Sequence, residues 1–287
     1  MPKSSKFPLF LLPLVVLNRV LILLTPFELV TLFTLKLYTF NDLISTIKNW
    51  ILYLEDLFNV PLREVNLDIL HLEQEEIYKV TDTFCSDDKK PLRKFVLRNG
   101  DDQGEINKTL IEDIIHRQNA KVTLELDFHP PSDFSWEPNR ISKKPILLHI
   151  DHCHWISVEH LMELDFQCVL LERSTLAGTD LIFLLRKLLL GFTPKWSNAE
   201  IIFKENVDLD LWIREMVNLH SAEGQEFLNI EEIQKVLIRR VEDTEESRKG
   251  PIKKIEYSFL RFDSDIIKIT MRDNKRAFIQ IFVNPLK

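Results

Sequence analysis

Residues 7–35 read FPLFLLPLVVLNRVLILLTPFELVTLFTL, and this strongly apolar stretch decides how the chain is interpreted. Its hydropathy alone suggests a targeting segment, because the short basic start Met1–Lys6 precedes the apolar run Phe7–Leu17, the order found in secretory signals. A spanning helix needs about 20 apolar residues. Here Arg19 would cost about 3 kcal/mol near the centre of a bilayer, and three prolines disfavour one continuous helix. A membrane-spanning helix is therefore disfavoured, while a signal segment remains an alternative.

The same stretch contains start signals for two short helices. Pro13 suits the first position of a helix, where its missing N–H costs nothing. Thr25 and Glu28 form a capping box around Pro26, so a second helix starts there. The apolar residues that follow each start recur at helical spacing, and a third start is predicted at Asn41. Helices that are apolar on all sides must be buried, and about 40 residues cannot bury them alone. The pattern predicts a protein partner.

The spacing of these residues resembles the F-box, the three-helix motif that docks onto the Skp adaptor of ubiquitin ligases. The resemblance covers residues 7–50. It implies that the chain binds a Skp-like adaptor and, through it, a cullin. The residues expected at that contact are Leu12, Pro13, Leu17, Val20, Leu24, Pro26 and Leu29.

Composition narrows the function classes. The formal charge of −7 argues against nucleic-acid binding, which requires basic patches to neutralise phosphates. Six unclustered glycines argue against a phosphate-binding loop. The three cysteines have no framework spacing, which favours a reducing compartment. The sequon at Asn107 matters only if the chain is secreted. Neither a nucleophile motif nor a cofactor is expected.

Alternating strand and helix patterns fill the region from residue 105 to residue 219. Strand-like segments start at intervals near the length of a leucine-rich-type repeat, which suggests either an open α/β layer or an irregular repeat arc. The predicted strands are Val122–Phe128, Ile146–Ile150, Cys168–Leu171 and Ala199–Phe203. The predicted helices are Glu105–Gln118, Ser157–Glu163, Gly178–Leu190 and Asp208–Leu219. Gly178 or Thr179 is expected to cap the third helix, and Gly191 to end it.

Two further segments are predicted near the C-terminus. The charged run Arg239–Gly250 is typical of a mobile linker. Beyond it, three alternating segments separated by polar turns predict an antiparallel meander, over Glu256–Phe262, Ile266–Met271 and Ala277–Val283.

A group of histidines between His149 and His160 invites a metal hypothesis. His152 and His154 would share a face if they lay on a strand. However, zinc sites usually add a second ligand pair such as Cys-x-x-Cys, and none is present in the sequence. A strand end followed by a helix-capping turn explains the group equally well, and we assign no metal ligands.

The segments around HIDHCHW, residues 149–155, and around RFD, residues 261–263, resemble the type-2 F-box-associated domain of nematode F-box proteins. The sequence thus predicts an α+β or α/β chain: an F-box over residues 7–50, then an irregular leucine-rich-repeat-like domain over 60–287 that ends in a meander. The resemblance implies a non-catalytic, cytoplasmic or nuclear adaptor that brings an unknown target protein to a ubiquitin ligase. The alternative is a secreted or membrane-tethered α/β protein with residues 1–24 as the targeting segment. A hydrolase or metal enzyme built on His149–His160 is a third class.

Overall fold

The structure is a computed structural model. It describes residues 43–70, 72–85, 90–99, 107–130, 134, 136, 141, 143–209, 211, 237–247, 250–260, 265–273 and 275–282. The predicted helix pair within residues 7–35 lies outside the described residues, as does most of the helix predicted over Asp208–Leu219.

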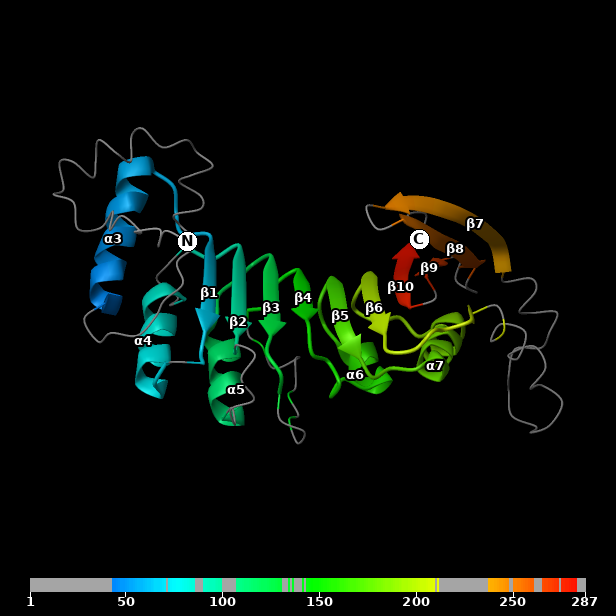
Figure 1. Ribbon diagram of the computed structural model, residues 1–287, viewed down its shortest axis with the longest axis horizontal. Coiled ribbons are helices and arrows are strands. Elements are labelled where there is room, and N and C mark those ends of the chain that lie inside the picture. Colours follow the sequence, from blue (N-terminus) through cyan, green and yellow to red (C-terminus); the bar gives the residue numbers. More distant parts are fainter. Residues whose placement is uncertain are drawn as a thin grey trace, which may run out of the picture.

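The described strands form one ten-stranded mixed sheet in the order β1-β2-β3-β4-β5-β6-β10-β9-β8-β7 (Figure 1). The first six strands pair in parallel and in chain order, whereas β10, β9, β8 and β7 continue the sheet in antiparallel pairs. The parallel strands are β1 (Glu64–Asp68), β2 (Lys94–Arg98), β3 (Thr123–Asp127), β4 (Leu147–Ile150), β5 (Cys168–Ser174) and β6 (Asn198–Phe203). The antiparallel strands are β7 (Leu237–Ser247), β8 (Gly250–Leu260), β9 (Ile266–Arg272) and β10 (Arg276–Phe282).

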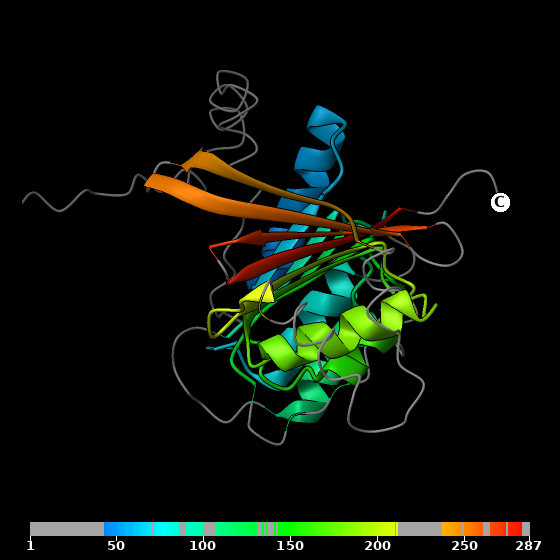
Figure 2. The ribbon, with the colours of Figure 1, turned by 90° about the vertical axis from the view of Figure 1, so that its right-hand side faces the viewer.

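Four helices lie on one side of the sheet, between successive parallel strands (Figure 2). They are α4 (Gln74–Phe84), α5 (Lys108–Arg117), α6 (Val158–Glu163) and α7 (Gly178–Leu189). Side chains alternate along a strand, so every second residue faces these helices. In β3, for example, Leu124 and Leu126 are buried while Glu125 is on the other face and partly exposed. The predicted mixture of strands and helices is thus present as a mixed α/β sheet with the described helices α4–α7 on one face.

Local signals set the helix ends. Asn107 caps α5, its side chain accepting from the backbone N–H groups of Thr109 and Leu110. Ser157 caps α6. The N-cap of α7 is Ala177 rather than Gly178 or Thr179, because the Asp180 carboxylate reaches back to the Ala177 N–H.

Gly191 ends α7 with φ +99°, as predicted. The backbone N–H of Phe192 then bonds the Lys187 carbonyl, which closes the helix in the manner of a Schellman motif.

The helix α3 (Leu43–Phe58) begins two residues after the third helix start predicted at Asn41 and runs without interruption to Phe58 (Figure 1). Its residues Ile47 and Ile51 belong to the same buried core as the strands. Of the helices that the structure describes, none is long and apolar enough to cross a membrane.

Two differences from the sequence prediction concern strands. The predicted mobile linker, Arg239–Gly250, is wrong: its residues form most of β7, which pairs with β8 along ten registered positions. Strand pairing uses the backbone, so a charged sequence can form a ladder without an apolar pattern. The elements β1, α4 and β2 were not predicted. In contrast, the four strands predicted between residues 122 and 203 and the three-stranded meander are confirmed. Most of their ends shift by three residues or fewer, but β8 begins at Gly250, six residues before the predicted start at Glu256.

Candidate functional site

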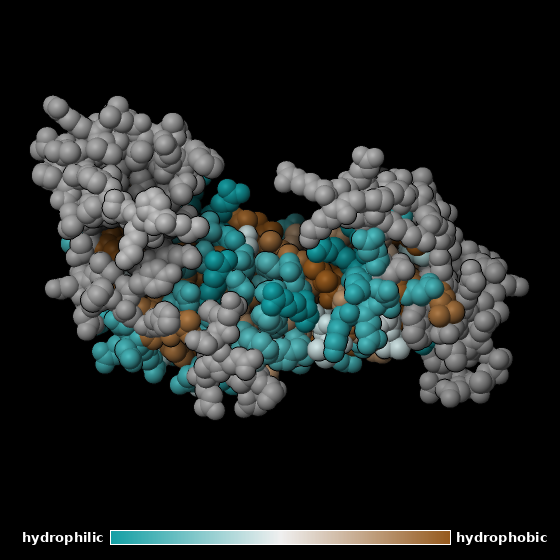
Figure 3. Space-filling view, viewed as in Figure 1, coloured by the Kyte–Doolittle hydropathy of each residue, from teal (hydrophilic) through white to brown (hydrophobic). Residues whose placement is uncertain are grey.

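The face of the sheet opposite the helices is the most prominent described surface, and we call it the open face. Parallel strands in register bring one residue from each strand into a row. The middle row runs through Asn66, Val96, Glu125, His149, Leu170, Glu200 and Phe278. From the viewpoint of Figure 1, the middle of the molecule shows mainly hydrophilic residues, with hydrophobic residues between them (Figure 3).

Strands β2 and β3 carry paired charges on this face. The Lys94 Nζ lies 2.6 Å from Glu125 Oε2, and the Arg98 Nε lies 2.9 Å from Asp127 Oδ2. The Glu125 side chain is only 13% exposed. Its pKa is lowered to about 2, chiefly by the imidazole of His149 and further by Lys94, which together outweigh the effect of burial. This part of the open face is electrostatically satisfied within the protein.

His149 lies between two carboxylates. Its Nδ1 is 3.6 Å from Glu125 Oε2 on β3, and its Nε2 is 3.4 Å from Glu172 Oε1 on β5. Burial acts to lower the pKa of His149, but the charges of Glu125, Glu172 and Asp151 outweigh it and raise that pKa. The neighbouring carboxylates therefore stabilise the charged imidazole against the effect of burial.

The middle of the open face differs from its two sides. On β4, β5 and β6 its residues are mainly apolar or acidic, and all are partly exposed. We call these eight residues the central patch: Leu147, His149, Cys168, Leu170, Glu172, Asn198, Glu200 and Ile202. The carboxylates of Glu172 and Glu200 stand on adjacent strands. Burial raises the pKa of Glu200 despite the opposing charges of Arg276 and Arg272, and the charge of Glu172 makes a smaller contribution in the same direction as burial.

Cations flank the central patch on the antiparallel side. The Arg276 Nη1 lies 3.3 Å from Glu200 Oε1, and the Lys268 Nζ lies 3.0 Å from Glu256 Oε2. The Arg272 guanidinium stacks 4.8 Å from the centre of the Phe278 ring. The central patch is thus bordered by the ion pairs of β2–β3 and by these basic side chains.

The histidine group predicted as one cluster is divided by the structure. His149 faces the open side of β4, while His152 and His154 follow the strand and His160 caps α6 beside Ser157. This is the strand end and capping turn expected as the alternative to a metal site. Among the described residues, no group of three or more His, Cys, Asp or Glu side chains is placed to hold a metal ion.

His152 and His154 instead pack against His129, with ring centres 4.9 and 5.2 Å from that of His129. Burial is the largest cause that lowers the pKa of both residues. The Nε2 of His152 lies 2.7 Å from Arg173 Nη1, so this nitrogen accepts from the guanidinium. Arg173 adopts a left-handed φ of +47° and also pairs with Asp151. The contribution of His129 was missed, because nothing in its local sequence connects it to residues over twenty positions later.

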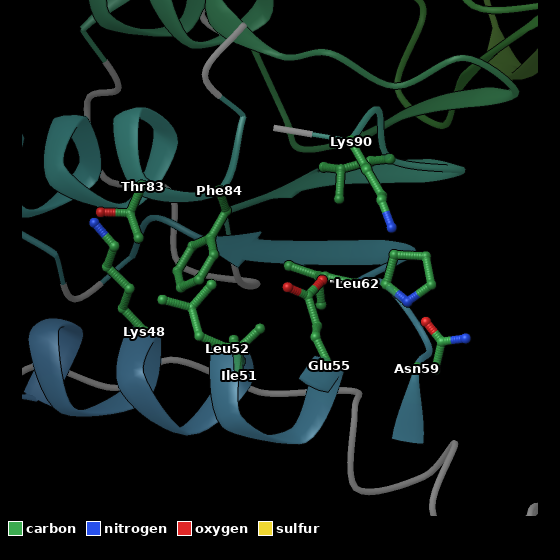
Figure 4. A pocket seen from close by; sticks show the side chains of 11 residues that line it. Lys48, Ile51, Leu52, Glu55, Asn59, Leu62, Thr83, Phe84 and Lys90 are labelled. Atoms are coloured by element: carbon green, nitrogen blue, oxygen red, sulfur yellow. Dashed lines mark hydrogen bonds between the residues drawn. The ribbon is translucent and has the colours of Figure 1, made fainter. Parts of the chain in front are cut away.

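A pocket of about 220 Å³ lies between α3, α4 and the start of the sheet (Figure 4). The Glu55 carboxylate accepts from the Leu62 N–H and so fixes the turn that leads from α3 into β1. The pocket is lined by Lys48, Ile51, Leu52, Glu55, Asn59, Pro61, Leu62, Thr83, Phe84, Lys90 and Leu92.

The seven residues predicted to contact a Skp-like adaptor all lie outside the described residues. The open-face residues were inside predicted strands but were not singled out. Glu125, His149 and Glu200 each lie inside a predicted strand, but they occupy different positions within those strands. Only the strand register of the structure brings them into one row.

Comparison with models of protein families, with curated proteins and with solved structures finds no match to this chain. Among the described residues, the fold is a mixed α/β sheet with α4–α7 on one face and paired charges on the other.

Proposed function

We propose that the chain is a non-catalytic substrate adaptor of a Skp–cullin–F-box ubiquitin ligase. Its N-terminal helices would dock on a Skp-like adaptor, and its leucine-rich-repeat-like domain would present the open face to a target protein. The observation that supports this function best is the order of the two parts. An apolar, helix-punctuated segment with an F-box-like leucine ladder precedes a mixed α/β domain in which the described helices α4–α7 leave the other face of the sheet free.

The proposed mechanism forms and breaks no bond in this chain. The adaptor would hold a target near a ubiquitin-charged enzyme carried by the cullin, and so raise its effective concentration. A stable contact with the Skp-like protein would bury on the order of 1,600 Å². The proposed contact residues remain Leu12, Pro13, Leu17, Val20, Leu24, Pro26 and Leu29. In this proposal the chain works in the cytoplasm or nucleus.

The test is co-purification of the full chain with a Skp-like adaptor. The double variant Leu17→Asp, Leu24→Asp places two charges in the proposed contact and should reduce complex formation at least about tenfold, since a buried unpaired charge costs several kcal/mol. The matched control is Leu190→Asp, Leu211→Asp, because both leucines are about half exposed, at 52% and 50%, in the repeat domain. Equal binding by both double variants, or no binding by the wild type, would reject the proposal.

The alternative, a secreted or tethered protein, predicts a different observable. A signal segment within residues 1–24 would be removed, so mass spectrometry of the protein from its native host would detect a new N-terminus. An intact N-terminus together with adaptor binding would favour the ubiquitin-ligase proposal.

A further inference from the structure

We propose that the edge of the sheet at which β1–β6 begin is an interaction surface, and that it binds an acidic segment of a partner protein. Parallel strands point the same way, so their starts lie along one edge (Figure 1). Exposed cations precede five of these six strands, and we call them the basic edge: Arg63, Arg93, Lys121, Lys144 and Lys195. This surface is independent of the proposed adaptor function, because it is built within the α/β domain alone.

The pairing of the parallel strands aligns the first cations of the basic edge. The backbone N–H of Arg93 donates to the Arg63 carbonyl at 2.7 Å. The N–H of Val122, which follows Lys121, donates to the Arg93 carbonyl at 3.1 Å. The N–H of Ile146 donates to the Lys121 carbonyl at 3.1 Å, so the start of β4 continues the row. Neighbouring strands lie about 4.8 Å apart, so the starts of β1–β4 span about 14 Å.

The first three cations of the basic edge have no ionic partner among the described residues. Arg63, Arg93 and Lys121 are exposed and take part in no ion pair there. Glu64, the residue after Arg63, lies 4.0 Å from the Lys94 Nζ on the open face. Because the three cations are exposed and unpaired, a partner's carboxylates reach them without breaking an ion pair of this chain.

The other two cations share one carboxylate. Lys144 bonds Asp165, and the Lys195 Nζ lies 3.1 Å from the same Oδ2 atom. One carboxylate against five cations leaves an excess of four positive charges along the basic edge. The open face is different, because its cations on β2 lie opposite carboxylates on β3. The excess charge of the basic edge therefore favours an anionic occupant.

Cations also stabilise the C-terminal ends of helices, and α5 and α7 end shortly before the strands β3 and β6 begin. These two helices have basic residues of their own in the last turn. They are His116 and Arg117 in α5, and Arg186 and Lys187 in α7. The basic edge therefore adds positive charge beyond what these helix ends already carry.

The side chains around the basic edge favour protein over other anionic partners. Single-stranded nucleic acid stacks its bases on exposed aromatic rings, whereas Phe166 and Trp196, at the starts of β5 and β6, are buried. The chain's charge of −7 also opposes a long polyanion. Ile146 is 46% exposed beside Lys121, too small an apolar surface to enter a membrane. A short acidic segment that includes an apolar side chain matches both the charges and this isoleucine.

The test uses fluorescein-labelled peptides of about 12 residues, with Gly and Ser around the central run Asp-Glu-Leu-Glu-Asp. Five extended residues span about 16 Å, close to the width of four strands. The matched peptide has Asn-Gln-Leu-Gln-Asn. Fluorescence anisotropy with the full chain measures binding. Each exposed ion pair contributes about twofold, so three should make the acidic peptide bind about eightfold more tightly than its amide counterpart. Raising the salt from about 0.05 M to about 0.5 M should remove most of this preference.

The triple variant Arg63→Gln, Arg93→Gln, Lys121→Gln removes the three unpaired cations. It should bind the acidic and the amide peptide within about twofold of each other, because the proposed ion pairs are lost. Unchanged thermal melting shows that the loss does not come from misfolding. A preference that survives in this variant, or an absence of preference in the wild type, overturns the inference.

The matched control removes three exposed cations elsewhere. Lys79 lies on α4, Lys204 follows β6, and Lys275 lies in the turn between β9 and β10. The variant Lys79→Gln, Lys204→Gln, Lys275→Gln changes the net charge by the same amount and should keep the eightfold preference. Equal loss in both triple variants would mean that only the total charge matters, and would overturn the inference.

Two further probes test the class of the occupant. They are a labelled single-stranded oligonucleotide of about 15 nucleotides and phosphatidylcholine vesicles with about 30% phosphatidylserine. The wild type should bind both more weakly than the acidic peptide. Tighter binding of either probe, lost in the triple variant of the basic edge, would assign this surface to nucleic acid or membrane and overturn the proposed occupant.

The basic edge and the proposed adaptor function fail separately. The Leu17→Asp, Leu24→Asp variant should keep the peptide preference, because its substitutions lie outside the α/β domain. If the preference holds while adaptor docking is absent in the wild type, only the adaptor function is rejected. If docking holds without the preference, only the basic edge is rejected as a binding surface.

Discussion

The two halves of the sheet build one continuous core in different ways. In the parallel half, β1–β6, short strands bury leucine, valine and phenylalanine against α4–α7. In the antiparallel half, strands of 7 to 11 residues bury mostly isoleucine and aromatic side chains. Parallel neighbours require a long crossover, whereas antiparallel neighbours need only a turn. The junction is the β6–β10 pair, where the chain's last described strand returns beside the sixth. The comparison shows that antiparallel strands can extend a parallel sheet without interrupting its buried core.

The largest effect is expected from matched core truncations in the two halves. Phe95 in β2 and Phe259 in β8 are both fully buried. Phe95→Ala and Phe259→Ala should each lower the free energy of unfolding by about 3–5 kcal/mol, through lost apolar burial and the cavity left behind. Calorimetry should show one shifted transition for both variants, because the core is continuous.

The opposite outcome is equally clear. If Phe259→Ala lowers the melting temperature of only part of the heat absorption and leaves the rest unchanged, the halves unfold separately. The view of the sheet as one cooperative unit would then be wrong.

A smaller effect on the free energy of unfolding is expected from two carboxylates of the open face, Glu125 and Glu200. Glu125→Gln should lower the free energy of unfolding at pH 7 by about 1–2 kcal/mol, since its ion pairs stabilise the folded state and solvent screens part of them. Glu200→Gln should leave stability unchanged or raise it, because burial disfavours the charged form of Glu200. Urea denaturation of both variants checks this difference.

The pH dependence follows from the same pKa shifts. The pKa of Glu125 is lowered from its ordinary 4.5 to about 2, so its contribution is fully present above about pH 4.5 and is lost as the pH falls toward 2. The pKa of His149 is raised, so its contribution is present below pH 6.5 and is lost as the pH rises through its folded pKa. Glu125→Gln should flatten the acid limb of the stability curve. An acid limb identical to that of the wild type would contradict the assigned pairing.

The third prediction tests the N-terminal cap of α5. Asn107 is exposed and caps α5, so Asn107→Ala should cost about 1 kcal/mol through two lost backbone hydrogen bonds. Asn107→Asp keeps the acceptor and should restore most of that stability. Equal stability of Asn107→Ala and the wild type in urea would show that water replaces the cap at no cost.

The sequence predicted the elements whose apolar residues are periodic. Residues 122–128 alternate and form β3, and Ile111, Ile114 and Ile115 recur at helical spacing and form the buried side of α5. It missed β1, because EVNLD holds only two apolar residues, and α4, whose start is a run of acidic residues. The polar residues of the open face come from several strands, and no single segment of the sequence shows that they lie together. Their grouping depends on strand register, which local sequence does not contain.

The last prediction concerns the local stability of β7, where the sequence prediction and the structure differ most. This strand lies at the edge of the sheet and pairs, among the described strands, with β8 alone. Its amides should therefore open at about 1–3 kcal/mol, well below those of β9, which has neighbours on both sides. Native-state hydrogen exchange followed by mass spectrometry measures both segments in one experiment. Exchange of residues 239–247 at the rate of an unfolded peptide would restore the linker interpretation. Protection intermediate between zero and that of β9 would establish that a strongly charged segment can extend the sheet through its backbone alone.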